Sequence, residues 1–330
     1  MMRPVKVSGL GTFVPPRTLT NEQLEQMVET SSDWIMQRTG IRERHIADKG
    51  VATSDIAYPA ALAAIAEAGI TPAHLGFIVV GTTTPDTIFP STACVLQARL
   101  GAANAWGFDL GAACSGFLYS LSTAYTMVAT GACDHALAVG ADVMSSIIDY
   151  TDRTTCILFG DGAGAVVLSA AGPAEPGIID FWNEIDGTGG PSLCMPAGGS
   201  RMPASHETVD KRLHFVKQDG TAVFKFAVRK TEEISRRLLE RNGLTSRDLD
   251  LFVSHQANRR IIEAATERLE LEPSRVIINL ERFGNTTAGT IPLALNDARA
   301  EGRLKKGNLV LLTSVGAGFT VGSVLLRWGC

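Results

Sequence analysis

The residue best suited to covalent chemistry in this sequence is Cys114, which lies among small residues in GAACSGF at 111–117. The apolar run 106–110 before it predicts a strand, and residues 115–130 after it predict a buried helix. A cysteine at a helix start faces unpaired backbone N–H groups and the positive end of the helix dipole. Both favour the thiolate, the nucleophilic form, and the small neighbours are expected to let another backbone or a substrate approach closely. On this stretch alone, a buried cysteine used only for packing stays an open alternative.

A nucleophilic cysteine needs a base or an electrostatic partner, and the second half of the chain offers His255 and Asn285. His255 follows the apolar run 251–254, so it is expected at the carboxyl end of a strand, where ligands bind in open α/β sheets. Asn285 follows Gly284 in the polar turn RFGNTTAGT. A lone histidine is usually a satisfied core or surface residue, and a lone asparagine in a turn is normally structural. The two are therefore candidates only in combination with Cys114.

The order of apolar runs indicates a duplicated, layered α/β fold. Short β-branched runs alternate with longer helical patterns, which is typical of a largely buried sheet covered by helices. AGITPAHLGFIVVGT at 68–82 aligns with NGLTSRDLDLFVSHQ at 242–256, and each half also has a Gly-Ala-Gly turn before an apolar strand. The repeat predicts two related halves, residues 1–172 and 173–330. The segment 186–220, rich in Gly, Pro and Ser, is expected to be a loop inserted in the second half.

The predicted elements follow from hydrophobic period and from helix-ending signals. Strands are predicted at residues 5–10, 77–81, 106–110, 136–140, 163–169, 251–254, 276–279, 309–313 and 323–328. Helices are predicted at residues 21–30, 54–68, 91–100, 115–130, 223–241, 258–269 and 291–301. Gly69, Gly131 and Gly243 follow three of these helices and are expected to end them.

Composition excludes several classes of protein. A net charge of −4 argues against a nucleic-acid binder, which would normally be basic. No run approaches 18 consecutive apolar residues, so no membrane span is expected. The N-terminal residues MMRPVKVSGLGTF have no long apolar segment and no small-residue cleavage site, which favours a cytoplasmic location. The six cysteines form no CxxC pair and the six histidines are scattered, so neither a metal site nor a disulfide framework is expected.

Four segments in chain order, AACSGF, SHQANRR, FGNTT and GAGFTVG, closely resemble the β-ketoacyl-acyl-carrier-protein synthase III family. SSDWIMQRTGIRERHI, IFPSTACVLQARLG and DRTTCILFGDGAGAVVL are also similar to that family, so the resemblance spans essentially the whole chain. It implies the thiolase-like duplicated five-layer αβαβα fold and a homodimer. It also implies a decarboxylating Claisen condensation that initiates fatty acid synthesis from a short acyl-CoA and malonyl-acyl carrier protein. No metal or redox cofactor is implied, since coenzyme A enters as the substrate thioester.

The resemblance also implies catalytic roles. Cys114 would take the acyl group from acyl-CoA, and His255 and Asn285 would donate hydrogen bonds to the thioester carbonyl of the malonyl group as it loses CO₂. The backbone N–H groups of Cys114 and Ala317 would form an oxyanion hole for the acyl-transfer steps. Preorganised donors suit chemistry in which negative charge develops on a carbonyl oxygen.

Further positions are implied to bind the substrates. Trp34 and Arg153 would hold the adenine of coenzyme A between them, and Arg38 would contact a phosphate. The channel for the pantetheine arm would be lined by Thr30, Gly220, Phe224 and Asn258. A basic patch for the acidic carrier protein would include Lys225 and Arg260, although a surface cation can also be a merely solvated charge.

The chain departs from the family pattern at several positions. Val315 and Val321 stand where aromatic residues are common, and the position of Val315 is one that helps to exclude water during decarboxylation. Glu267 replaces a frequent lysine in the basic patch. Phe89 matches a position that reaches across the dimer and limits acyl length in some members, which predicts short acyl groups.

These departures keep open a related enzyme of specialised metabolism that condenses or transfers unusual acyl groups. A catalytically silent scaffold subunit is a second alternative, but such proteins typically lose the nucleophile, and Cys114, His255 and Asn285 are all present. The hydroxymethylglutaryl-CoA synthase branch would need a carboxylate base near the cysteine, and no matching motif is found. Plain thiolases have a second cysteine in the C-terminal glycine turn, which SVGAGF lacks.

Overall fold

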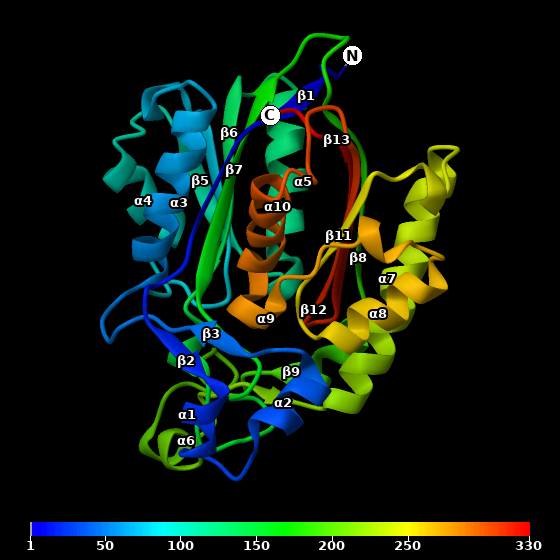
Figure 1. The fold of residues 1–330 in the computed structure, drawn as a ribbon. Coiled ribbons are helices and arrows are strands. Elements are labelled where there is room, and N and C mark those ends of the chain that lie inside the picture. Colours follow the sequence, from blue (N-terminus) through cyan, green and yellow to red (C-terminus); the bar gives the residue numbers. More distant parts are fainter. Residues whose placement is uncertain (1) are drawn as a thin grey trace.

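The structure, a computed structural model, describes residues 2–330 and consists of five layers (Figure 1). Two β-sheets lie on either side of a central layer of helices, and other helices cover the outer face of each sheet. The outer helices of the first sheet are α3 (Thr53–Glu67) and α4 (Thr92–Leu100), and those of the second are α7 (Gly220–Arg241) and α8 (Arg259–Arg268). The central layer contains α5 (Gly116–Ala129) and α10 (Thr290–Ala300). The predicted αβαβα fold is confirmed.

Each sheet takes its strands from one side of residue 172. The first has the order β1 (Val5–Phe13), β7 (Gly162–Ala170), β6 (His135–Asp142), β4 (Phe77–Gly81) and β5 (Trp106–Leu110). The second has the order β11 (Leu251–Ser254), β12 (Leu309–Gly316), β13 (Thr320–Arg327) and β8 (Ile178–Ile185). Pairing is parallel where β4 meets β5 and β6 and where β11 meets β12, and antiparallel elsewhere in these two sheets. The domain boundary near residue 172 stays a prediction.

The aligned segments of the sequence repeat adopt the same local structure. After α3, Gly69 has a φ of 68°, a short 3₁₀ helix follows at Pro72–His74, and the chain enters β4. After α7, Gly243 also has a φ of 68°, a 3₁₀ helix follows at Ser246–Asp248, and the chain enters β11. The left-handed conformation is one that glycine adopts without a steric penalty, which explains why both helices end at these residues.

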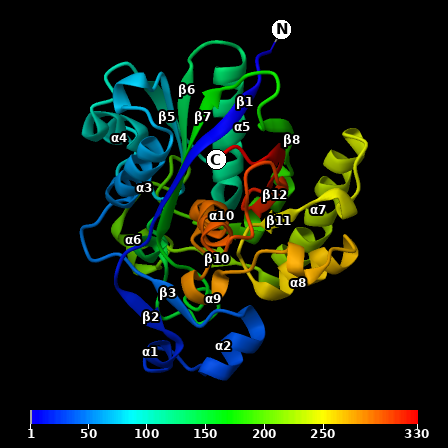
Figure 2. The same ribbon diagram turned by 45° about the horizontal axis from the view of Figure 1, so that its top comes forward.

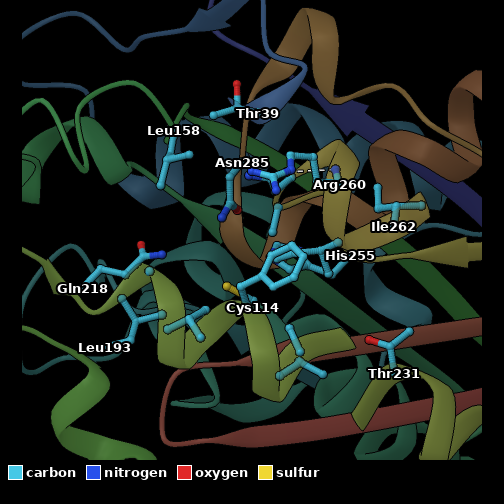
Figure 3. A pocket seen from close by; sticks show the side chains of 18 of the residues that line it. Thr39, Cys114, Leu158, Leu193, Gln218, Thr231, His255, Arg260, Ile262 and Asn285 are labelled. Carbon is cyan, nitrogen blue, oxygen red and sulfur yellow. Dashed lines mark hydrogen bonds between the residues drawn. The ribbon is translucent and has the colours of Figure 1, made fainter. Parts of the chain in front are cut away.

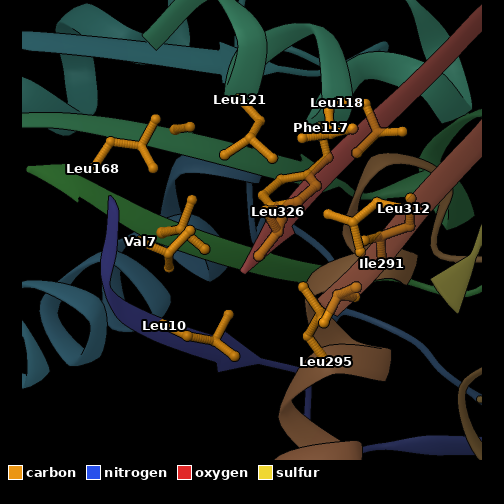
Figure 4. Packing of buried hydrophobic residues seen from close by; sticks show 14 of the residues in the cluster. Val7, Leu10, Phe117, Leu118, Leu121, Leu168, Ile291, Leu295, Leu312 and Leu326 are labelled. Atoms are coloured by element: carbon orange, nitrogen blue, oxygen red, sulfur yellow. The ribbon is translucent and has the colours of Figure 1, made fainter. Parts of the chain in front are cut away.

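The central layer is apolar because α5 and α10 are covered on both sides by sheets. Phe117, Leu118 and Leu121 of α5 pack with Ile291 and Leu295 of α10 (Figure 4). The same cluster includes side chains from both sheets, among them Val7, Leu10, Leu168, Leu312 and Leu326. Burial of one such side chain contributes about 1.5–3 kcal/mol, so this cluster is a large favourable term in joining the two sheets.

Two predicted elements differ in the structure. The helix predicted at 21–30 is only α1 (Asn21–Glu25), because the Ser31 hydroxyl accepts a hydrogen bond from the Trp34 N–H and starts a separate helix, α2 (Ser32–Thr39). The strand predicted at 276–279 is also wrong. Only one bridge joins it to β11, because the Gln256 side chain accepts from the Asn279 N–H and donates to the Ile277 carbonyl.

Several short elements were not predicted. β2 (Thr18–Thr20) pairs with β3 (Glu43–His45), and both lie with α1 and α2 at one end of the layers (Figure 2). Segment 186–220 is not a plain loop, since it contains a 3₁₀ helix (Gly187–Ser192), β9 (Leu193–Cys194), α6 (His206–Asp210) and β10 (Lys217–Gln218). The edge strand β8, which is longer, and the short helix α9 (Leu280–Phe283) were not predicted either. No helix within residues 2–330 combines the length and apolarity needed to cross a membrane.

The close contact between α5 and β4 predicts that one methyl group added at Gly81 lowers the stability of the protein. A Cβ at Gly81 would lie 2.5 Å from the carbonyl carbon and oxygen of Gly116. Gly81→Ala should therefore lower the free energy of unfolding by about 1–3 kcal/mol, as overpacking does, measured by urea denaturation. Gly199→Ala is the matched control, since Gly199 is exposed with no atom within 4 Å of the added carbon, and should change stability by less than about 0.5 kcal/mol. Equal stability of the two variants would contradict this packing.

Candidate active site

Cys114 lies in a strained turn between β5 and α5. It is part of the short 3₁₀ helix η2 (Ala113–Ser115), and Ala113 before it has a φ of 46°, in the left-handed region. Non-glycine residues in this region are uncommon and concentrate at functional sites. The Cys114 side chain is buried, with 7% exposure. The second half of the chain holds this turn, because the Ser314 hydroxyl donates to the Cys114 carbonyl at 2.8 Å.

Gly316 and Gly116, both close to Cys114, each allow a different close contact. A Cβ at Gly316 would lie 2.8 Å from the Cys114 backbone nitrogen, so the turn that contains Ala317 approaches Cys114 closely only because residue 316 is glycine. A Cβ at Gly116 would lie 3.3 Å from Ala288 Cβ and from the Cα of Gly81. At Gly116 it is therefore another backbone, that of Gly81, that approaches closely, as one of the two predicted alternatives had it.

His255 follows β11, as predicted, and has one ring nitrogen engaged and one free. Its Nδ1 lies 2.7 Å from the Thr290 hydroxyl, and its backbone N–H donates to the Thr313 carbonyl at 2.8 Å. Its Nε2 is buried, and no group among residues 2–330 forms a hydrogen bond with it. Burial lowers the pKa of His255 to about 3, so the imidazole is neutral at physiological pH. A hydroxyl can donate or accept, so Thr290 is compatible with a proton on either ring nitrogen.

Asn285 is held so that its amide N–H₂ group remains available. Its backbone N–H donates to the Leu158 carbonyl at 2.9 Å, and its carbonyl accepts from the Gly160 N–H at 3.0 Å. Its side-chain oxygen accepts from the Thr287 N–H at 2.9 Å. Because the oxygen is already engaged, the side chain presents a donor to its surroundings.

Cys114, His255 and Asn285 line one cavity of about 650 Å³, although they come from three distant segments (Figure 3). Other predicted site residues also line it: Trp34, Arg38, Gly220, Phe224, Lys225, Asn258, Arg260 and Val315. Phe319 lines the same cavity as Val315 and stacks on Phe226 with ring centroids 4.1 Å apart. The structure thus brings most of the predicted residues together.

Three of the predicted residues, Thr30, Phe89 and Arg153, do not line this cavity. The Thr30 hydroxyl is buried and has no hydrogen-bond partner among residues 2–330. Phe89 projects into solvent with 83% exposure. The Arg153 guanidinium lies over the Trp34 ring, 5.1 Å from its centroid, and donates to the Glu29 carbonyl. The two groups predicted to hold adenine therefore contact each other, and Arg153 must move before a base can enter between them.

The pKa of Cys114 differs from the expectation. Burial raises it to about 12, the nearby Asp142 raises it further, and a hydrogen bond from Asn285 opposes the rise. The prediction that the helix start favours a resting thiolate is therefore wrong, because desolvation outweighs it. The resting side chain is a thiol.

Two functional residues were missed in the sequence. Thr290, the partner of His255, is the last residue of the motif RFGNTTAGT. A threonine hydroxyl in such a polar turn gives no distinct signal in the sequence. Asp142 is a fully buried carboxylate at the end of β6. A charged residue closing an apolar strand was a usable signal there, because such residues are rarely buried without a specific role. Within residues 2–330, no cluster of His, Cys, Asp or Glu is arranged to hold a metal ion.

The raised pKa of Cys114 predicts the pH dependence of its alkylation. Since a pKa of about 12 leaves the thiol protonated, the iodoacetamide reaction should accelerate about tenfold per pH unit from pH 7 to 9.5. A short unstructured peptide with one internal cysteine is the reference, and its rate should level off above about pH 9. The modified Cys114 peptide is followed by mass spectrometry. A plateau below pH 8 at Cys114 would show that the thiolate is stabilised instead.

Comparisons with known proteins agree with the geometry. The family model described as 3-oxoacyl-[acyl-carrier-protein (ACP)] synthase III matches residues 108–187, and its C-terminal counterpart matches residues 239–328. The β-ketoacyl-[acyl-carrier-protein] synthase III of Solibacter usitatus is 58% identical over 99% of both chains. That of Koribacter versatilis is 56% identical over 99% of this chain and 98% of its own.

A solved structure has the same fold. The crystal structure of 3-oxoacyl-(acyl carrier protein) synthase III from Pseudomonas aeruginosa is 41% identical, covers 99% of both chains and superposes with a TM-score of 0.92. The chain therefore belongs to the β-ketoacyl-acyl-carrier-protein synthase III family of thiolase-like condensing acyltransferases.

Proposed function

We propose that this enzyme condenses a short acyl-CoA with malonyl-acyl carrier protein, with loss of CO₂, to give a 3-oxoacyl-acyl carrier protein that initiates fatty acid synthesis. One observation carries the proposal: a thiol, a neutral imidazole with a free Nε2 and an amide whose engaged oxygen leaves its N–H₂ group as the donor line one cavity. The relatives at 56% and 58% identity, which bear the synthase III name, support the same reaction over specialised metabolism.

In the first step the acyl group moves from coenzyme A to Cys114. The sulfur attacks the thioester carbonyl, the bond to coenzyme A breaks, and the Cys114 proton leaves on the released CoA thiol. The backbone N–H groups of Cys114 and Ala317 are the proposed donors to the transient oxyanion. The close approach of Gly316 to the Cys114 nitrogen supports this assignment, since it brings the two turns together.

In the second step the malonyl group loses CO₂, and negative charge develops on its thioester oxygen. His255 Nε2–H and Asn285 Nδ2–H donate to that oxygen. For Nε2 to carry the proton, Nδ1 must accept, and the Thr290 hydroxyl is in place to donate to it. The lowered pKa of His255 suits this role, because the ring stays neutral and donates without first taking up a proton.

The carbanion then attacks the acyl group on Cys114. A carbon–carbon bond forms, the carbon–sulfur bond breaks, and the released thiolate takes a proton from water, as its high pKa requires. No step calls on a metal or redox cofactor, and coenzyme A enters only as the thioester substrate.

The substrates are proposed to enter past α7 and α8. Trp34 and Arg38 line the cavity on the side of α2 and are assigned to coenzyme A together with Arg153, Thr30, Gly220, Phe224 and Asn258. Lys225 and Arg260 are exposed and line the same cavity, and the Arg260 guanidinium lies 5.7 Å from the Phe224 ring centroid. These two cations are proposed to meet the acidic carrier protein.

A homodimer is proposed from the open edge of the first sheet. β5 is an edge strand, and its Trp106 and Phe108 are 56% and 38% exposed. Ile88 and Phe89 are 85% and 83% exposed, an unusual amount of apolar surface for a free chain. In such a dimer Phe89 is proposed to limit acyl length in the partner. A cytoplasmic location stays a prediction from sequence.

Acyl transfer to Cys114 is tested by intact-protein mass spectrometry with a panel of acyl-CoAs. Wild-type enzyme should gain the mass of one short acyl group, and Cys114→Ala should gain none, because it lacks the nucleophile. Cys133→Ala is the matched control, since that cysteine does not line the cavity, and should be acylated like wild type. A Cys114→Ala variant that still becomes acylated would refute the assignment.

The division of roles predicts different effects on the two half-reactions. His255→Ala and Asn285→Ala should each slow decarboxylation of malonyl-carrier protein by about 10²–10³-fold, the usual loss on removing an oxyanion donor. Acylation of Cys114 from acetyl-CoA should change by less than about fivefold, because another pair of donors serves that step. Both rates are measured separately by CO₂ release and by acyl-enzyme formation. Equal losses in both would contradict this division.

A further inference from the structure

Asp142 is a buried carboxylate that the proposed reaction does not use directly. It ends β6 with 0% exposure, and five groups donate hydrogen bonds to it. Four of them come from the threonines that follow β4 and reach Oδ1: the hydroxyls of Thr82, Thr83 and Thr84 and the N–H of Thr83. No cation is among these donors. Such a complete set of donors matches the needs of a buried carboxylate.

The fifth donor comes from the other half of the chain. The Ala288 N–H donates to Asp142 Oδ2 at 3.1 Å, and Ala288 belongs to the short 3₁₀ helix η7 (Thr287–Gly289). This helix lies between Asn285 and Thr290, the residue that contacts His255. Asp142 therefore links the end of β4 to the turn that carries half of the proposed decarboxylation machinery.

That turn is strained and depends on its hydrogen bonds. Thr287 has a φ of 52°, an unfavourable conformation for a β-branched residue. Its N–H donates to the Asn285 side-chain oxygen at 2.9 Å. The next N–H along the chain is the one that Asp142 holds. Loss of this bond would let the turn relax and move both Asn285 and the partner of His255.

We propose that Asp142 is a positioning residue for decarboxylation, whose carboxylate fixes the turn 285–290 and through it the Asn285 amide and the His255 imidazole. This inference rests on the proposed function. It assigns Asp142 no contact with the substrate.

The charge of Asp142 supplies a second, independent readout. Burial raises the pKa of Asp142, and the hydrogen bonds that it accepts oppose this rise. In its ionised form Asp142 raises the pKa of Cys114, after burial itself, so its removal should make the thiol more acidic. The elements packed against η2 are α5, β12, β13 and η7, and their one charged residue is Arg327 at the far end of β13. Of the other titratable groups that line the cavity, His255 is neutral, and Arg38, Lys225 and Arg260 are exposed cations. A residue with only a structural role would not shift the alkylation profile of Cys114.

Asp142→Asn removes the charge with little change of shape. Each carboxylate oxygen accepts a backbone N–H, from Thr83 on Oδ1 and from Ala288 on Oδ2. An amide has one oxygen, so whichever way it turns, one of these N–H groups faces an N–H₂ group.

Asp161→Asn is the matched control. Asp161 is equally buried, and its two oxygens accept the N–H groups of Ser145 and Ala47 instead of any group in η7.

The expected result is a selective loss. Asp142→Asn should decarboxylate malonyl-carrier protein about tenfold to 10²-fold more slowly, while acylation of Cys114 from acetyl-CoA changes by less than about threefold. Its Cys114 alkylation profile should also move to lower pH. Asp161→Asn should alter neither the ratio of the two half-reactions nor that profile. Unchanged decarboxylation in Asp142→Asn, or equal losses in both half-reactions with an unmoved profile, would overturn the inference.

Two further measurements apply if Asp142→Asn does not fold or if the wild-type enzyme does not decarboxylate malonyl-carrier protein. If Asp142→Asn does not fold, Thr83→Val removes one hydroxyl from Oδ1 and should lower the decarboxylation-to-acylation ratio several-fold, by about threefold or more. An unchanged ratio there would overturn the inference. If wild-type enzyme does not decarboxylate malonyl-carrier protein, the proposed function fails. The ¹⁵N shifts of the His255 ring then test Asp142 separately, and shifts identical in wild type and Asp142→Asn would overturn it.

Discussion

The close contact of the Gly116 backbone with Gly81 and Ala288 is the constraint on which the site depends. At this point the start of α5, the end of β4 and the turn that carries Asn285 come together. Gly140 on β6 completes the contact, since a Cβ there would lie 2.4 Å from the Ala288 carbonyl oxygen. Glycine at three of the four positions lets backbones from both halves approach this closely. Cys114 and Asn285 can therefore face one cavity, although they are 171 positions apart in the sequence.

Burial at this junction decides the electrostatics of the site. It raises the pKa of Cys114 to about 12 and lowers that of His255 to about 3, so both groups are neutral at rest. A neutral site suits a reaction in which charge develops on the substrate, because the fixed donors stabilise it without first exchanging protons. Asp142 is a buried carboxylate close enough to Cys114 to raise its pKa, and its hydrogen bonds occupy both of its oxygens. Its proposed role is therefore to hold the turn in place.

Much of this arrangement could be predicted from sequence, for physical reasons. Strands buried on both faces, such as β4, are continuous apolar runs, and the helix ends at Gly69 and Gly243 follow from backbone freedom. Cys114 and His255 were found because each follows a predicted strand, and Asn285 because it lies in a polar turn that resembles the family motif. The strand predicted at 276–279 failed because a side chain, Gln256, takes the place of a backbone partner. The local pattern of apolar residues does not show that a side chain will take the place of a backbone partner.

The missed features all depend on tertiary contacts. The pKa of Cys114 reflects how deeply the folded chain buries it, which outweighs the helix start seen in the sequence. Thr290 and Asp142 matter because of groups 35 and 146 positions away. The contact between Arg153 and Trp34 joins two residues that were predicted separately to surround a ligand. The spacing of residues along the sequence predicts neither how deeply a side chain is buried nor which distant residue it contacts.

The most direct test of the central claim is a single turnover of the acyl-enzyme. Wild-type enzyme is acetylated on Cys114, freed of excess acetyl-CoA and mixed with malonyl-carrier protein while both proteins are followed by intact-mass spectrometry. The acetyl mass on the enzyme should disappear as 3-oxobutyryl-carrier protein and one equivalent of CO₂ appear. Persistence of the acetyl-enzyme, or formation of acetyl-carrier protein without CO₂, would contradict the account.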